Sequence, residues 1–157
     1  MFINEYSRSN IKYYSSGEND GLCVAYNYIL DMCIKDDVDC LCTSDQDSDF
    51  STELLVNMIE MVKGKDKKTC IISPRNVPLG KQIKTGYRGK YSSVEWCICS
   101  GSFIDISIIK KYKIKYDEAF FIDRFDQGMC KDIKKCGYNI VLCNNLVFEQ
   151  PLGYVKN

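Results

Sequence analysis

The residues best suited to chemistry follow a short apolar run in the first third of the chain. Residues 38–43 (VDCLCT) are too few for a core helix and rich in strand formers, so they predict a buried strand. Asp45 and Asp47 come directly after this run, at positions i and i+2, and project toward the same side of the strand end. Such a pair can hold a hard divalent cation while leaving coordination sites open for phosphate oxygens. The segment therefore predicts a site for a metal ion and a phosphate group.

Two other interpretations of this acidic segment fit less well. A calcium loop of the EF-hand type needs glycine at its sixth position and a bidentate glutamate at its twelfth, where this chain has Phe50 and Val56. A helix N-cap, stabilised by the helix dipole, accounts for Asp49. It does not account equally well for Asp45 and Asp47, and the metal site stays the leading hypothesis.

The chain has ten cysteines and no histidine. The missing histidine excludes Ser-His-Asp and Cys-His catalysis. It also argues against a zinc site, because no CxxC spacing is present. The CxC pairs at residues 40–42 and 97–99 lie in strand-like runs, where both sulfurs are expected on one buried face. We therefore expect reduced thiols that serve as small hydrophobic side chains.

Hydrophobic periodicity predicts alternating strands and helices. An apolar stripe from Leu22 to Cys33 predicts a helix, and a second helix is expected to begin at Asp49 or Ser51 and to end at Gly64. Further strands are expected at 11–15, 38–43, 68–73 and 138–150, and a polar loop is expected at 75–93. Another strand is expected from residue 95; it breaks at 100–102 and resumes as an apolar segment to 109. A third helix is expected at about 126–136. This order predicts an α/β fold with a mostly parallel sheet and helices on both faces, with ligands at the carboxyl ends of the strands.

Length and composition favour a single domain over residues 1–157. The chain is 45% hydrophobic and 27% charged, which suffices for one core of moderate size. Its 21 Lys and Arg residues balance 21 Asp and Glu residues, so we expect no nucleic-acid partner. No segment approaches the roughly 18 apolar residues of a membrane helix, and the N-terminus is too polar for a secretory signal, so we expect a cytoplasmic protein.

Charge is distributed unevenly along the chain. Eight acidic residues lie between Asp31 and Glu53 with only Lys35 to offset them, whereas residues 63–68 and 110–115 are basic runs. The basic runs fit solvated faces of the protein. They also fit a peripheral contact with the anionic inner face of a membrane.

Four segments of the chain match the motifs of one known family. Residues 43–50 (TSDQDSDF) resemble a DxD segment that follows an apolar strand. Residues 18–27 look like an N-x-G…A-x-N helix start, and residues 99–104 (CSGSFI) are similar to an SGS-type segment beside an acceptor site. Residues 116–126 (YDEAFFIDRFD) resemble a stretch that ends in a catalytic aspartate. Together, over about residues 10–153 and in the family's order, these segments resemble family 2 glycosyltransferases with the GT-A fold, in particular their rhamnosyltransferase-like branch.

This resemblance implies a donor site for a dTDP- or UDP-sugar. In it, Asp47 helps to bind Mg²⁺ or Mn²⁺ against the diphosphate, and Asp45 contacts the ribose or the metal. Asn19 and Gly21 belong to the same donor site. The metal would stabilise the negative charge that builds on the leaving nucleoside diphosphate.

The resemblance also implies an acceptor site for a glycan or lipid-linked acceptor of bacterial surface polysaccharide. Asp126 would be the general base that takes the proton of the acceptor hydroxyl as it attacks the anomeric carbon with inversion. A first-turn helix carboxylate is the alternative for Asp126. Ser100 and Gly101 would lie beside the acceptor, with a simple strand break as the alternative. Trp96 would either stack on a sugar or belong to the core.

Several features depart from the family pattern. The family domain begins with a βαβ unit that holds the nucleobase, and this sequence starts after it, so we expect a partial GT-A-like domain with apolar surface left for a partner chain or self-association. Gly128 stands where a second acidic residue is usual, Asp132 where arginine is common, and Gln150 where histidine is frequent.

Two alternatives to an active glycosyltransferase remain. The chain could be a degenerate, non-catalytic remnant or one half of a split enzyme that acts as a binding partner. A nucleotidyltransferase also uses acidic pairs after a parallel strand. It normally needs a glycine-rich phosphate loop near its start, and the sequence has none.

Overall fold

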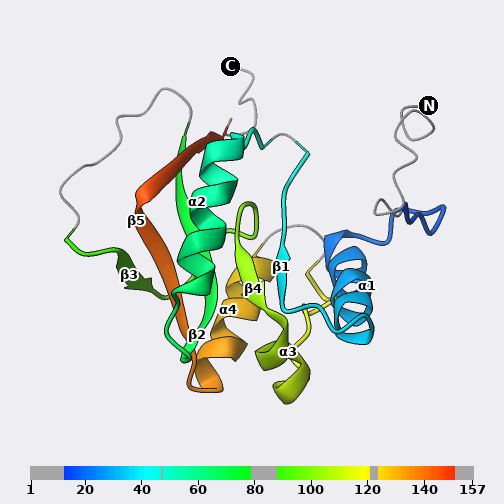
Figure 1. The fold of residues 1–157 in the computed structure, drawn as a ribbon. Helices are drawn as coiled ribbons and strands as arrows, with labels where there is room; N and C mark the ends of the chain where they lie inside the picture. The colour runs from blue at the N-terminus through cyan, green and yellow to red at the C-terminus, as the bar shows by residue number, and fades with distance from the viewer. Residues whose placement is uncertain (1–12, 47, 79–87, 121–123, 151–157) are drawn as a thin grey trace.

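The chain folds into an α/β structure in which helices cover both faces of one sheet. The computed structural model describes residues 13–46, 48–78, 88–120 and 124–150. Its elements, labelled in Figure 1, are α1 (Leu22–Lys35), β1 (Cys40–Cys42), α2 (Thr52–Lys63), β2 (Thr69–Pro78), β3 (Tyr91–Val94), β4 (Phe103–Asp105), α3 (Ile106–Tyr112), α4 (Phe125–Lys135) and β5 (Asn139–Gln150).

The helix ends expected from the sequence agree with the structure more closely than the expected strand ends do. The Ser51 hydroxyl caps α2 by accepting from the Leu54 N–H at 3.1 Å, and Gly64 follows its last turn. The strand expected at 11–15 is not confirmed, because residues 13–15 are irregular and residues 11 and 12 lie outside the described residues. The strand expected from residue 95 is wrong, because β3 ends at Val94 and β4 begins only at Phe103.

The sheet is mixed, with the strand order β1-β4-β2-β5-β3. β2 and β5 are parallel, whereas the pairs β1–β4, β4–β2 and β5–β3 are antiparallel. The expectation of a mostly parallel sheet was therefore wrong. The physical reason is that β3 and β4 are entered without a preceding crossover helix, which a parallel neighbour normally requires.

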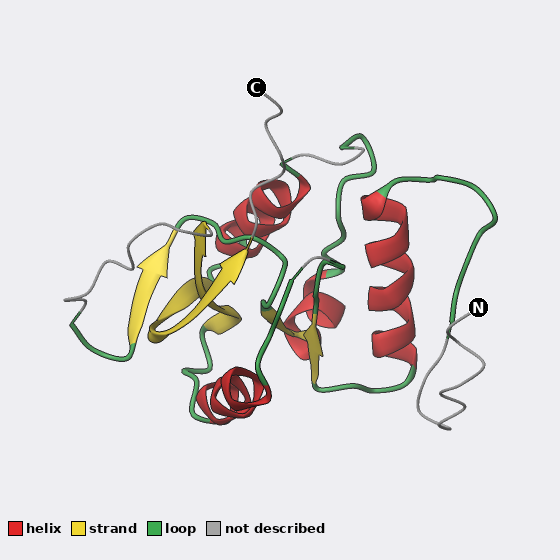
Figure 2. Cartoon of the chain, turned by 90° about the horizontal axis from the view of Figure 1, so that it is seen from above, coloured by secondary structure: helices red, strands yellow, loops and turns green. Residues whose placement is uncertain are grey.

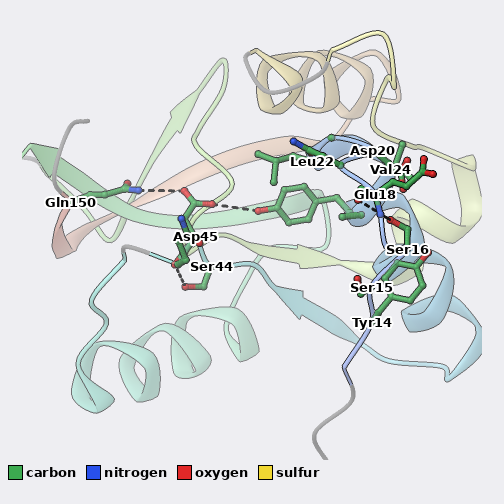
Figure 3. A pocket seen from close by; sticks show the side chains of 15 residues that line it. Tyr14, Ser15, Ser16, Glu18, Asp20, Leu22, Val24, Ser44, Asp45 and Gln150 are labelled. Atoms are coloured by element: carbon green, nitrogen blue, oxygen red, sulfur yellow. Dashed lines mark hydrogen bonds between the residues drawn. The ribbon is translucent and has the colours of Figure 1, made fainter. Parts of the chain in front are cut away.

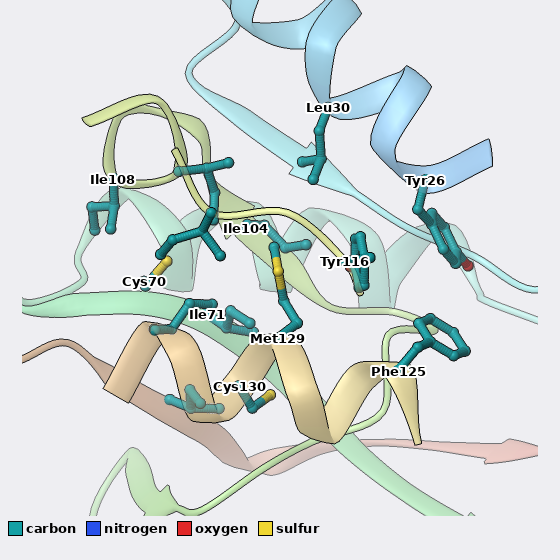
Figure 4. Packing of buried hydrophobic residues seen from close by; sticks show 14 of the residues in the cluster. Tyr26, Leu30, Cys70, Ile71, Ile104, Ile108, Tyr116, Phe125, Met129 and Cys130 are labelled. Atoms are coloured by element: carbon teal, nitrogen blue, oxygen red, sulfur yellow. The ribbon is translucent and has the colours of Figure 1, made fainter. Parts of the chain in front are cut away.

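Two hydrophobic clusters separate the helices from the sheet. The larger cluster lies under α1, α3 and α4, where Leu30 and Met129 pack with the strand residues Ile71 and Ile104 (Figure 4). The smaller lies under α2. Adjacent strand residues divide between them: Ile71 faces the larger cluster and Ile72 the smaller, as strand geometry requires. The view from above shows helices on both sides of the strands (Figure 2).

A bulge in β2 modifies this alternation. The register with β5 shifts between Thr69 and Ile71, so that Thr69 pairs with Asn139 and Ile71 with Ile140. Cys70 is the extra residue, and both Cys70 and Ile71 consequently belong to the larger cluster. The pattern of apolar and polar residues in the sequence does not indicate this bulge.

Cysteines are distributed over both clusters as free thiols. The expectation that each CxC pair shares one buried face was wrong for residues 40–42, because Cys42 is exposed on the edge strand β1. It holds only in part for residues 97–99, where Cys97 is buried and Cys99 half-buried outside any strand. Within the described ranges, no helix combines the length and the apolar character of a membrane span.

Candidate functional site

A cavity of about 720 Å³ opens between the start of α1 and the loop after β1. Its walls come from three parts of the chain: residues within 14–26, residues 44–46 and Gln150 at the end of β5 (Figure 3). A volume of this size lies within the usual range of small-molecule sites, roughly 300–1,000 Å³.

The cavity brings together three residues that the sequence assigns to a donor site. Asn19 and Gly21 lead into α1, Asp45 follows β1, and all three line the same cavity. Asp47, which the sequence assigns to the metal, lies outside the described residues. The structure thus shows that Asn19, Gly21 and Asp45 line one cavity, and their binding roles stay predictions.

Asp45 is held from three directions. Its Oδ1 atom accepts a long hydrogen bond of 3.5 Å from the Tyr26 hydroxyl, and its Oδ2 atom accepts one of 3.3 Å from the Gln150 side-chain amide. Its backbone N–H donates to the Ser100 hydroxyl at 3.0 Å. The Asp45 carboxylate therefore lies between Tyr26 and Gln150 at the wall of the cavity.

Tyr26 links Asp45 to Cys99. Its hydroxyl lies 3.6 Å from the Cys99 sulfur, and burial, followed by the effects of Cys99 and Asp45, raises the pKa of Tyr26 well above its usual range. The phenol thus stays protonated and can act as a donor to Asp45. Burial also raises the pKa of the Cys99 thiol to about 12; a hydrogen bond with Tyr26 lowers it, and the Asp45 and Asp126 carboxylates raise it further. The Tyr26 hydroxyl thus connects Cys99 with the Asp45 carboxylate.

Ser100 lies beneath the acidic loop and supports it. Its side chain is fully buried, and its hydroxyl lies 2.6 Å from the Ser48 hydroxyl as well as accepting from Asp45. Thr43 is tied to the same turn, because its N–H donates to the Ser102 carbonyl at 3.1 Å and its hydroxyl donates to the Cys99 carbonyl. The turn at 99–102 therefore fixes both ends of the loop that carries Asp45.

Gly101 makes this turn possible. Its φ of +75° is a conformation that side-chain-bearing residues rarely adopt, and a Cβ atom would lie 2.9 Å from Phe50 Cε1 and 3.1 Å from Pro74 Cγ. Its N–H donates to the Thr43 carbonyl at 2.7 Å. Ser100 and Gly101 are both buried and do not line the cavity. Their predicted contact with an acceptor stays a prediction, and the geometry assigns them a supporting position.

Asp126 lies in the first turn of α4, half-buried. Its Oδ1 atom accepts from the Gln127 N–H at 2.7 Å, and it borders a very small apolar cavity that Cys97 and Cys99 also line. This position fits a first-turn carboxylate that the helix dipole favours. The role of general base stays a prediction. Trp96 is 47% exposed, which rules out a place in the core and leaves sugar stacking as its predicted role.

The electrostatics of the large cavity are dominated by carboxylates. Glu18, Asp20 and Asp45 line it, and no lysine or arginine is among its described lining residues. Among the described elements at the cavity, the start of α1 supplies positive potential, because Gly21 is its N-cap and no side-chain hydrogen bond caps the first-turn amides. An anionic ligand would therefore need a cation beside it in this cavity.

Oxygen atoms of three lining side chains lie at one end of the cavity. Asp45 offers a carboxylate, and Ser44 and Gln46 offer further side-chain oxygens. Oxygen ligands of this kind suit Mg²⁺ and Mn²⁺. In the part of the chain that the structure describes, no group of three or more Asp, Glu, Cys or His residues could hold a metal ion.

Three departures from the family pattern have distinct surroundings. Gln150 is part of the site, because its side-chain amide donates to Asp45. Its side-chain oxygen accepts from the Asn76 amide at 2.6 Å. Asp132 forms an ion pair of 2.7 Å with Lys135 on the surface of α4. A Cβ atom at Gly128 would meet Phe120 at 3.7 Å, an ordinary contact, so packing does not require glycine there.

Sequence reasoning missed Tyr26, Cys99 and Gln150 as site residues. The sequence places Tyr26 only in the buried stripe of a helix and marks Gln150 only as a departure from the family pattern. No residue-level signal links these three residues, because each belongs to a different element. No family model matches the chain, and no curated protein matches it.

Proposed function

We propose that this chain takes part in glycosyl transfer from a nucleotide-sugar donor to a glycan or lipid-linked acceptor in polysaccharide biosynthesis. The observation that carries the proposal is the shared cavity of Asn19, Gly21 and Asp45. The resemblance to family 2 glycosyltransferases assigns all three to the donor, although they come from separate segments. Their convergence on one cavity of suitable size supports that assignment.

Within this proposal, each end of the cavity has a part in donor binding. Asp45, together with Asp47 in the resemblance, would hold Mg²⁺ or Mn²⁺, which offsets the charge of the leaving diphosphate. Tyr26 and Gln150 orient the Asp45 carboxylate through their hydrogen bonds. The uncapped start of α1 directs backbone N–H groups toward phosphate oxygens.

The remaining groups concern the acceptor and the sugar. Asp126 would accept the proton of the acceptor hydroxyl during an inverting displacement. The rhamnosyltransferase-like branch makes dTDP-rhamnose the first donor to test and a UDP-sugar the second. We place the reaction in the cytoplasm, where nucleotide sugars would be the donor pool, with a peripheral position at the inner face of the membrane as an extension of the proposal.

Removal of the charge at residue 45 tests the donor site. Asp45→Asn keeps a hydrogen-bond acceptor for Tyr26 but loses the negative charge that would hold the cation. We expect the affinity for dTDP or UDP in the presence of Mn²⁺ to fall at least tenfold, about 1.4 kcal/mol. Titration calorimetry measures it, with Asp47→Asn as a second variant.

Asp49→Asn is the matched control, because Asp49 is exposed in the same acidic segment and does not line the cavity. Its affinity should equal that of the wild type. Unchanged nucleotide affinity in Asp45→Asn and Asp47→Asn would contradict the proposal. Transfer from dTDP-rhamnose to an acceptor is the next assay once metal-dependent binding is established.

A second candidate function is that of a non-catalytic binding partner or one half of a split enzyme. The observation that favours it is the edge of the sheet. Among the described residues, β1 pairs with β4 alone, which leaves backbone N–H and C=O groups at its other edge. Separately, Val56 and Ile59 on α2 are 53% and 44% exposed and add apolar surface to the molecule.

The two candidates differ in what they predict for the purified chain. A binding partner shows no donor hydrolysis or transfer with any divalent metal, and it forms a stable complex with another chain or with itself. Light scattering of the purified chain, followed by transfer assays across several metals, separates the two. A monomer that transfers sugar excludes the second candidate.

A further inference from the structure

We propose that Tyr14 provides the surface on which the nucleobase of the donor stacks, an inference that rests on the proposed glycosyltransferase function. The Tyr14 ring lies parallel to the Tyr28 ring, with centroids 3.8 Å apart and an interplanar angle of 16°. Tyr28 belongs to α1, so a helix positions this pair. An aromatic ring held flat in this way is a preformed stacking surface.

One face of the Tyr14 ring remains available to a ligand. Tyr28 covers the other face, yet Tyr14 keeps 50% of its surface exposed. Tyr14 lines the large cavity, whereas Tyr28 does not. Tyr28 therefore supports the ring from behind, and a planar base entering the cavity would extend the stack.

The backbone after Tyr14 is held by local hydrogen bonds. The Ser15 hydroxyl accepts from the Gly17 N–H at 3.2 Å, and the Ser16 hydroxyl accepts from the Glu18 N–H at 3.3 Å and donates to the Glu18 carbonyl at 3.0 Å. These turns bring Ser15, Ser16 and Glu18 to the wall of the cavity. Their oxygens offer hydrogen-bond partners for the edge of a base or for ribose hydroxyls.

The position of Tyr14 relative to Asp45 fits an extended nucleotide. Figure 3 shows Asp45 and Gln150 at one end of the cavity, Tyr14, Ser15 and Ser16 at the other, and Leu22 at the start of α1. A base on Tyr14 would place the diphosphate toward the α1 amides and Asp45. In the family pattern, a preceding βαβ unit makes the base contact, and Tyr14 would make one from within these 157 residues.

The test compares ligands with and without a base, using the full chain. Titration calorimetry with Mg²⁺ measures the affinity for UDP and dTDP and for inorganic pyrophosphate. Tyr14→Ala should weaken nucleotide binding roughly tenfold, the scale of a single base–aromatic stack, and leave pyrophosphate binding unchanged. Tyr14→Phe keeps the ring and should bind like the wild type, as should Tyr13→Ala, because Tyr13 is 70% exposed and does not line the cavity.

A second measurement separates the stacking surface from the proposed function. Saturation-transfer NMR with uridine and thymidine, without metal, reports a base contact that needs no diphosphate. Nucleoside signal that Tyr14→Ala abolishes supports the stacking surface even if the chain binds no nucleoside diphosphate. Wild-type nucleotide affinity in Tyr14→Ala, an equal loss for pyrophosphate, or the absence of nucleoside signal from the wild type would overturn it.

Discussion

Ser100 shows how a buried side chain can control a site that it does not line. Its hydroxyl receives the Asp45 N–H and lies against the Ser48 hydroxyl, so both sides of the acidic loop depend on one oxygen atom. The resemblance implies a role for Ser100 beside the acceptor, because it places an SGS-type segment there. Burial changes the expected effect of mutation from lost acceptor contact to lost order in the donor site.

Ser100→Ala should release the Asp45 N–H from its hydrogen bond. An unsatisfied buried group costs about 1–3 kcal/mol, so we expect a moderate loss in the free energy of unfolding together with weaker nucleotide binding. Amide hydrogen exchange, followed by NMR, should show faster exchange at Asp45. Ser93→Ala, at an exposed position on β3, is the control, and retained protection at Asp45 in Ser100→Ala would contradict the supporting role.

Alanine substitutions at Gly101 and Gly137 together separate the cost of backbone strain from the cost of steric overlap. Gly101→Ala combines a φ of +75° with a Cβ atom 2.9 Å from Phe50, whereas Gly137→Ala has a φ of +83° and no described heavy atom within 4 Å. We expect Gly137→Ala to cost about 1–2 kcal/mol and Gly101→Ala at least about 1 kcal/mol more. Urea denaturation of both variants measures the difference. Equal costs would show that Phe50 moves away freely.

At the scale of elements, the sequence predicted helices better than strand partners. Apolar spacing and the signals at Ser51 and Gly64 located α2, because capping chemistry is local. Strand direction depends on which distant segment supplies the hydrogen bonds. Nothing in residues 103–105 indicates that β4 enters antiparallel between β1 and β2. The sequence does not indicate the bulge at Cys70 either, because a bulge also depends on pairing with a distant strand.

The junction between β4 and α3 was also missed, although a signal for it exists. Asp105 ends the strand and caps the helix, since its Oδ1 atom accepts from the N–H groups of Ser107 and Ile108 at 3.0 and 3.3 Å. Its Oδ2 atom accepts from Lys65 at 2.6 Å. An aspartate two residues before Ser107 within an apolar run is a capping signal that the sequence interpretation did not use.

Asp105 should make stability depend on pH in the acid range. Burial would raise the pKa of Asp105, but hydrogen bonds from Lys65 and Ser107 outweigh it and lower the pKa below its usual 3.8. A lowered pKa in the folded state contributes stability above about pH 4, which is lost as the pH falls further. Asp105→Asn keeps the cap and loses the charge, so its disadvantage at pH 7 should shrink as the pH falls toward 3.

Urea denaturation between pH 7 and pH 3 measures this difference. Asp49→Asn, at an exposed position, should follow the wild type throughout. A constant gap between the wild type and Asp105→Asn at every pH would show that the Lys65–Asp105 pair has no part in acid sensitivity.

At the scale of the whole molecule, the site depends on long-range arrangement. The strand-end rule of α/β proteins identified Asp45, whereas Asn19 and Gly21 were assigned to the donor only by the resemblance. It could not indicate that Tyr26 and Gln150 would hold Asp45, since these contacts depend on the packing of α1 and β5 against the loop. Local patterns thus located candidate residues, and tertiary structure supplied their partners.

The tertiary structure also determines which surface charges are compensated by a partner. The two basic runs suggested either a solvated face or a contact with an anionic membrane. Within the described residues, four lysines of these runs form ion pairs: Lys63 with Glu60, Lys65 with Asp105, Lys110 with Asp37, and Lys115 with Asp31. The local ion pairs weaken the attraction of these four lysines for anionic lipid.

The buried thiols are divided between the two faces of the sheet. Their reactivity can therefore report separately on the opening of each face. Burial raises the pKa of Cys70 and of Cys143 to about 12, so neither forms the reactive thiolate while the fold is closed. Cys70 lies in the cluster under α1, α3 and α4, and Cys143 in the cluster under α2. The rate at which an alkylating reagent modifies each cysteine therefore reports how often each layer of helices separates from the sheet, and equal rates would mean that both layers open in a single event.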